Sequence, residues 1–105
     1  MVGERLDPVL ISRFIWTSGP VGNVAHVARH DVTPEDVLEV AGIEPHFYVN
    51  RPGRQATHVM LGPNGLGRFL YVAMSRIRDQ ESWYVSTAHW LDHRRGQRLY
   101  NRAKE

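Results

Sequence analysis

The stretch Arg68-Phe69-Leu70-Tyr71-Val72-Ala73-Met74-Ser75 predicts the strongest β-strand of the chain, because large apolar, aromatic and β-branched side chains dominate it without a glycine or proline. Shorter runs of the same kind lie at residues 46–49, 57–61 and 83–88, with turn-forming residues between them. Strands joined by such short turns pair with their neighbours in antiparallel fashion. The second half of the chain is therefore expected to form an antiparallel meander.

Toward the N-terminus, residues 9–16 predict one more strand, and residues 21–41 predict two short helices. The break between the helices falls at His30-Asp31, and Thr33 followed by Pro34 is a favourable helix start. The apolar faces of the two helices are expected to consist of Val21, Val24, Val27 and Ala28, and of Val37, Val40 and Ala41. Residues 92–105 predict a polar, basic C-terminal helix.

The expected order of elements is therefore β-α-α-β-β-β-β-α, which defines an α+β fold. A length of 105 residues is typical of one domain, here expected over residues 1–105 with residues 1–8 as a loose leader. We expect the helix pair to cover one face of an antiparallel sheet and to leave the other face partly open. An open sheet face flanked by arginine side chains suits the binding of an extended polyanion.

The cysteine count restricts the chemistry and the compartment. The chain has no cysteine, which excludes a disulfide framework, a thiolate metal site and a cysteine nucleophile. No signal-peptide pattern and no apolar run of membrane-spanning length is found in the sequence. We therefore expect a cytoplasmic protein that does not associate with a membrane.

Charge is distributed unevenly along the chain. Residues 1–50 carry three Arg against seven acidic residues, a net charge of −4, whereas residues 51–105 carry ten basic against four acidic residues, a net charge of +6. All of the basic residues except Lys104 are Arg, the side chain best suited to bidentate contact with phosphate and to stacking on bases. The basic second half favours RNA as a partner, and an Arg-rich solvated surface is the alternative.

Four pieces of sequence also follow one another in an informative order. They are Phe14-Ile15-Trp16 with Asn23; His30-Asp31-Val32-Thr33-Pro34-Glu35-Asp36-Val37; Leu61-Gly62 with Gly67-Arg68-Phe69-Leu70-Tyr71-Val72; and Val85-Ser86-Thr87-Ala88 with Arg98-Leu99-Tyr100. Their order and spacing resemble the BrnT family, the toxin half of a type II toxin–antitoxin pair. The second piece is similar to the family's "kHGv-f-e-A" joint between two helices.

The resemblance implies a RelE-like fold and a small ribonuclease that cleaves RNA without a metal or other cofactor and arrests translation. It further implies a BrnA-like antitoxin of the ribbon-helix-helix type, and a homodimer or a toxin–antitoxin hetero-oligomer. Two positions depart from the family pattern: His89 stands where the closing strand usually has Arg, and Thr57 where an Arg commonly begins an earlier strand. A catalytically inactive binding or dimerisation module, or an RNA-binding protein without cleavage, remains as the alternative.

RNA cleavage by its own 2′-hydroxyl needs a base, an acid and cations around the phosphate. His58 and His89, both on expected strands, are the candidates for acid and base, because imidazole titrates near neutral pH. Arg54, Arg68 and Tyr100 are the candidates around the phosphate. Each histidine could instead be a partly buried structural residue. Arg68 could instead pair with Asp31, Asp79 or Glu81.

Further arginines are candidates for RNA contact. Arg94, Arg98 and Arg102 recur every four residues in the expected C-terminal helix and would form one stripe. The complete RNA-binding set is Arg51, Arg94, Arg95, Arg98 and Arg102. His26 and His30 have the spacing of a helical metal pair, but no third ligand accompanies them, so no metal is expected.

Overall fold

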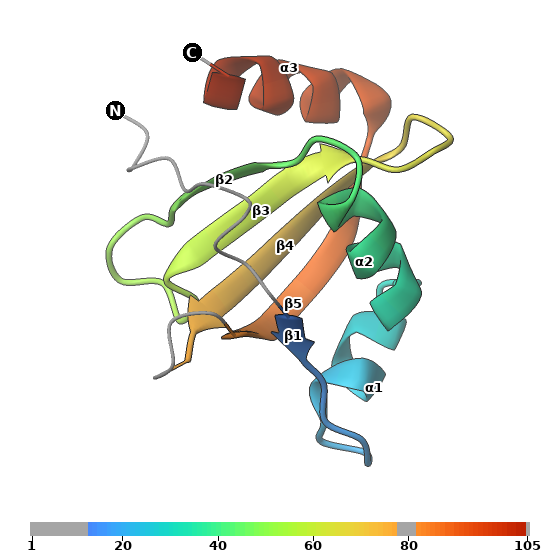
Figure 1. The fold of residues 1–105 in the computed structure, drawn as a ribbon, viewed down its shortest axis with the longest axis vertical. Helices are drawn as coiled ribbons and strands as arrows, with labels where there is room; N and C mark the ends of the chain where they lie inside the picture. The colour runs from blue at the N-terminus through green and yellow to red at the C-terminus, as the bar shows by residue number, and fades with distance from the viewer. Residues whose placement is uncertain (1–12, 78–81, 105) are drawn as a thin grey trace.

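The computed structural model describes residues 13–77 and 82–104 (Figure 1). Its elements are β1 (Arg13–Ile15), α1 (Asn23–Ala28), α2 (Pro34–Ala41), β2 (His46–Val49), β3 (His58–Pro63), β4 (Phe69–Arg76), β5 (Ser82–Leu91) and α3 (His93–Lys104). The predicted order β-α-α-β-β-β-β-α is confirmed. The expected leader, the first residues of the expected N-terminal strand and the polar turn at residues 79–81 lie outside the described residues.

The strands form one five-stranded mixed sheet in the order β1-β5-β4-β3-β2. The predicted antiparallel meander from β2 to β5 is confirmed. The expectation of a wholly antiparallel sheet is wrong, because β1 pairs with β5 in parallel. The helix pair carries the chain from β1 to β2 at the opposite edge, and a long crossover of this kind permits parallel pairing.

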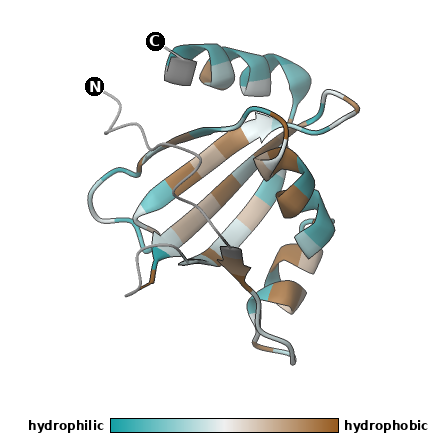
Figure 2. Cartoon of the chain, viewed as in Figure 1, coloured by the Kyte–Doolittle hydropathy of each residue, from teal (hydrophilic) through white to brown (hydrophobic). Residues whose placement is uncertain are grey.

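Two apolar cores pack against opposite faces of the sheet. The larger core joins α1 and α2 to the sheet, with Val27, Val37 and Val40 of the helices packed against Leu70 and other strand residues. The smaller core lies beneath α3, which crosses the end of the sheet where β3 ends and β4 begins (Figure 1). The remaining surface of α3 is mostly hydrophilic (Figure 2). The helix pair therefore covers one face as predicted, whereas α3 covers only part of the other.

The α1–α2 joint shows what the sequence pattern predicts well and what it does not. A capping box between Thr33 and Asp36 starts α2 at the predicted position. In α1, Val27 is buried as predicted, but Ala28 is exposed and Val21 is 97% exposed. The apolar face predicted for the first helix was therefore wrong at both of its ends. Helix α1 begins only at Asn23, so Val21 precedes it and is not held against the sheet.

Asn23 is a buried hydrogen-bonding centre that fixes α1 to the sheet. Its Nδ2 group donates to the carbonyl oxygens of Ile15 (2.9 Å) and Val85 (3.0 Å). Its Oδ1 atom accepts from the backbone N–H of Thr17 at 2.7 Å. β1 ends at Ile15, so the β5 edge beyond Tyr84 has no neighbouring strand, and the Asn23 amide supplies a hydrogen bond there instead.

Replacing Asn23 by Ala is expected to lower the free energy of unfolding by about 3 kcal/mol, because buried backbone groups lose their partners. Urea denaturation measures the loss. Asn101→Ala is the matched control, since Asn101 is exposed and accepts a hydrogen bond from Gln97 on its own helix, and its effect should stay within about 0.5 kcal/mol. Equal stabilities of the two variants would contradict the role given to Asn23.

Gly96 sets the distance between α3 and the sheet. A Cβ atom at this position would lie 2.5 Å from the Phe69 Cβ, far inside van der Waals contact. The Phe69 Cβ is attached directly to the β4 backbone, so a side-chain rotation cannot move it away. Glycine in the first turns of α3 therefore allows the close approach, despite its poor helix propensity.

Gly96→Ala is expected to destabilise the protein by about 1–3 kcal/mol through overpacking. In an unhindered helix, a Gly-to-Ala change instead raises the free energy of unfolding by about 1 kcal/mol. Urea denaturation distinguishes the two signs, with Arg98→Ala on the exposed side of the same helix as control. Unchanged or increased stability of Gly96→Ala would show that α3 does not pack this closely.

Candidate nucleic-acid interface

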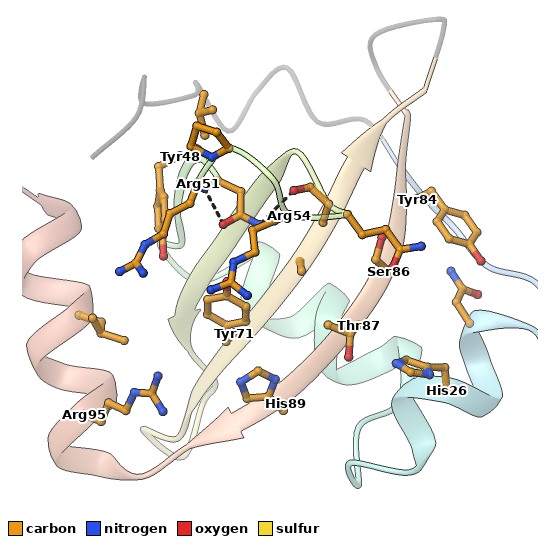
Figure 3. Close-up of a pocket in the computed structure, with 18 of the residues that line it drawn as sticks. His26, Tyr48, Arg51, Arg54, Tyr71, Tyr84, Ser86, Thr87, His89 and Arg95 are labelled. Atoms are coloured by element: carbon orange, nitrogen blue, oxygen red, sulfur yellow. Dashed lines mark hydrogen bonds between the residues drawn. The ribbon is translucent and has the colours of Figure 1, made fainter. Parts of the chain in front are cut away.

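The part of the sheet face that α3 leaves open is hollowed into a broad groove of about 1450 Å³ (Figure 3). Its floor comes from β4 and β5, and its sides come from α3, from the β2–β3 loop and from α1. The ionisable side chains that line it are Arg51, Arg54, Arg95, Arg102, His26, His89 and the three tyrosines Tyr48, Tyr71 and Tyr84. None of the described lining residues is acidic. The groove therefore concentrates positive charge over a surface of aromatic rings.

A β-bulge in β5 determines which side chains reach the groove floor. Ala73 pairs with Thr87, and the next residue, Met74, pairs with Val85, so Ser86 is the extra residue. Strict alternation would place His89 on the same face as Trp83 and Val85, both fully buried in the core under the helix pair. The bulge reverses the alternation, and His89 lies on the groove side instead.

His89 is the histidine at the centre of this floor. It is half-buried, and its ring stacks on Tyr71 with centroids 5.0 Å apart and planes 26° apart. Burial lowers the pKa of His89 below its ordinary value of 6.5, and the charges of His30 and Arg95 lower it further. The imidazole is therefore neutral at pH 7 and can accept a proton.

Tyr48 and Tyr71 occupy the aromatic part of the groove, and the sequence reasoning missed both. Burial raises the pKa of Tyr48 to about 12, and the neighbouring Tyr71 raises it while Arg51 opposes the change. Tyr48 therefore stays protonated at neutral pH and can donate a hydrogen bond. The alternation within residues 68–75 could have revealed Tyr71, because it lies out of phase with the core residues Leu70, Val72 and Met74.

Arg51 and Arg54 line the groove from the loop between β2 and β3. Asn50 closes this loop twice, with its N–H donating to the Thr57 carbonyl (2.8 Å) and its Nδ2 to the Ala56 carbonyl (3.0 Å). A compact loop of this kind holds two exposed guanidinium groups beside the sheet. Their predicted places near a phosphate site are compatible with the groove, and their roles stay predictions.

Of the stripe predicted on α3, Arg102 lines the groove, whereas Arg94 and Arg98 do not, and the RNA-binding role of the three arginines stays a prediction. Among the α3 side chains that the structure describes, the groove is lined by Arg95, Leu99 and Arg102. The reason is the docking of α3, since Gly96 and Tyr100 form its buried side and leave Arg94 and Arg98 exposed outside the groove. Arg95 and Arg102 are therefore the two α3 arginines placed to contact a ligand there.

His58 and His89 do not lie together, contrary to the expectation of one acid–base pair. His58 pairs with Met74, a residue of the core beneath the helix pair, and its ring packs edge-on against Trp83 at 4.7 Å. Its Nδ1 atom lies 2.7 Å from the Thr57 hydroxyl. His58 is therefore on the opposite face of the sheet from His89, because side chains alternate between the two faces along β3.

Arg68 and Tyr100 are also outside the groove. The Arg68 guanidinium lies over the Trp90 ring, 4.2 Å from its centroid, on the side of the helix pair. The Tyr100 hydroxyl donates to the Glu44 carbonyl oxygen at 2.6 Å, and its ring packs on Phe69. Tyr100 thus anchors α3 to the sheet. The sequence had suggested that both residues lie close to His89 and the groove arginines, and the structure places both outside the groove.

His26 lines the groove, a place that the sequence did not predict for it. Its ring lies edge-on to that of His30, with centroids 5.8 Å apart. Among the residues that the structure describes, no group of three His, Cys, Asp or Glu side chains is arranged to hold a metal ion.

None of the described helices is long and apolar enough to cross a membrane.

The groove and the mixed sheet define an α+β protein with a cationic, aromatic concavity on one face. Comparison with family models, with curated proteins and with solved structures gives no match to this chain.

Proposed function

We propose that this protein binds single-stranded RNA in the groove and cleaves it there, as the toxin of a type II toxin–antitoxin pair with a BrnT-like, RelE-like fold. The observation that carries the proposal is the composition of the groove, where four arginines and two histidines lie together and none of the described lining residues is acidic. Such a surface attracts phosphates and repels no part of an RNA backbone.

The chemistry requires only groups that proteins and RNA supply. His89 removes the proton of a 2′-hydroxyl, whose oxygen attacks the adjacent phosphorus. Guanidinium groups of the groove stabilise the negative charge that develops on the phosphate oxygens. As the new bond forms, the bond from phosphorus to the 5′-oxygen breaks and the departing oxygen takes up a proton, which gives a 2′,3′-cyclic phosphate and a 5′-hydroxyl end. The step needs no metal or cofactor. The RNA bases would lie over the tyrosines of the floor.

One feature of the helix joint supports the family resemblance. Asp31 has φ of 61°, a left-handed conformation in which glycine is favoured, and the BrnT-like joint has Gly at this place. Around it, the N–H groups of Asp31 and Val32 donate to the carbonyls of Ala28 and Val27. On this proposal the protein acts in the cytoplasm, arrests translation, and is neutralised by a ribbon-helix-helix antitoxin in a hetero-oligomer.

RNA binding without cleavage is the second candidate function, and the position of His58 favours it. Because His58 lies on the opposite face, the two histidines predicted as acid and base cannot act on one phosphate. Incubation of the protein with labelled single-stranded RNA in EDTA separates the candidates. New 2′,3′-cyclic phosphate ends support the ribonuclease, whereas salt-sensitive binding with intact RNA supports the binding protein. Neither binding nor cleavage would contradict both.

A further inference from the structure

His26 lies in the same groove as His89, although the two come from different elements. Figure 3 shows His89 on the floor between Arg95 of α3 and His26 of α1, with Thr87 between the two histidines in this view. His30 links them in space, since its ring centre is 5.8 Å from that of His26 and 6.1 Å from that of His89. These two contacts keep the ring centres of His26 and His89 within about 12 Å of each other, along one side of a continuous groove.

The position of His26 is fixed by the packing of α1. Asn23 ties the start of α1 to the Val85 carbonyl of β5, and Val27 is fully buried in the core. His26 follows Asn23 by three residues, so it lies on the same side of the helix, at the margin of the buried surface. Its half-buried ring thus lines the same groove as Ser86 and Thr87 at the β5 bulge.

The opposite wall of the groove has a different composition. Arg95 and Arg102 come from α3 and Arg51 and Arg54 from the β2–β3 loop, whereas the α1 side has imidazole and hydroxyl groups. A phosphodiester on the floor at His89 would have guanidinium groups on one side and the His26 imidazole on the other. This arrangement supplies a separate group for the second proton transfer that transesterification requires.

We propose that His26 is the general acid that protonates the leaving 5′-oxygen, while His89 on β5 acts as the base. This inference rests on the proposed ribonuclease function. In the step, the 2′-oxygen forms a bond to phosphorus and the bond from phosphorus to the 5′-oxygen breaks. The proton of the 2′-hydroxyl passes to His89, and His26 gives one to the departing oxygen. No oxidant, reductant or co-reactant is needed, and both imidazoles return to their starting states by exchange with water.

The test compares His26→Ala and His26→Gln with wild type on two single-stranded RNAs. One RNA is natural, and the other has sulfur in place of the 5′-oxygen at one linkage, a leaving group that needs no general acid. On natural RNA we expect both variants to be at least about 100-fold slower than wild type with similar RNA affinity. On the sulfur-containing RNA the difference should nearly vanish, while His89→Ala stays slow on both.

The outcomes separate this inference from the function on which it rests. Cleavage of natural RNA by His26→Ala and His26→Gln at the wild-type rate would overturn the role of His26 alone. An equal defect on both RNAs would also overturn it, since loss of structure or binding does not depend on the leaving group. Intact RNA with wild-type protein would overturn the ribonuclease function and this role together. His93→Ala, on α3 outside the groove, is the control expected to keep the wild-type rate.

Discussion

His89→Ala is expected to lower the rate of RNA cleavage by about 100- to 10,000-fold and to change RNA affinity little. The imidazole stacks on Tyr71 at the groove floor, and its lowered pKa keeps it unprotonated at neutral pH. The arginines that would bind the phosphates stay in place in the variant. Loss of the base therefore affects the chemical step far more than binding.

The pH dependence of wild-type cleavage follows from the direction of that pKa shift. A base must be unprotonated to act, and the pKa of His89 lies below 6.5. On the acidic side of the pH profile, the cleavage rate should therefore fall only as the pH drops below 6.5. This acidic decline should be missing in His89→Ala.

His58→Ala is the informative control for this prediction. His58 faces the core beneath the helix pair and packs on Trp83, so its loss affects stability but not the groove. Single-turnover cleavage, measured where both variants are folded, should be near wild type for His58→Ala and nearly abolished for His89→Ala. Equal loss in both variants would contradict the assignment of the two histidines to opposite faces.

The second large effect is expected from charge on α3. Arg95→Gln combined with Arg102→Gln should weaken RNA binding about 10- to 100-fold at low salt. The slope of log affinity against log salt should become shallower by about 0.7 for each phosphate that the variant no longer neutralises. Both side chains line the groove, and both substitutions keep a polar side chain on the helix surface.

The matched control is Arg94→Gln combined with Arg98→Gln, which removes the same charge from the same helix. Arg94 and Arg98 are exposed outside the groove, so only the long-range part of the electrostatic attraction should disappear. Fluorescence anisotropy with a short labelled RNA, over a range of salt concentrations, measures both pairs. Equal weakening by the two pairs would show that RNA responds to the overall charge of α3 and not to the groove.

The strand-rich half of the fold was predictable because local patterns and tertiary packing agree there. The alternation in residues 68–75 separates Leu70, Val72 and Met74, which are buried beneath the helix pair, from Tyr71, which faces the groove. The short turns then require antiparallel pairing from β2 to β5. The parallel pairing of β1 was not predictable from local pattern, because it depends on where the helix crossover returns the chain.

The site was less predictable because it depends on two non-local features. The bulge at Ser86 decides on which face His89 lies, and the residue pattern of β5 alone does not reveal it. The docking of Gly96 and Tyr100 decides which arginines of α3 face the groove. The apolar residues of α3 could have predicted part of this docking, because Tyr100 lies on the buried side of the helix and Arg95 lies at the margin of that side.

The central claim is that RNA occupies the groove on the open face of the sheet. The most direct test is to follow backbone amide resonances during titration with a short single-stranded RNA whose 2′-hydroxyls are methylated to prevent cleavage. We predict that the shifts concentrate at Arg51 to Arg54, at Ser86 to His89 and along the Arg95–Arg102 side of α3, while α2 is unaffected. Shifts concentrated on α2 and the helix-covered side, with the groove residues unchanged, would contradict the claim.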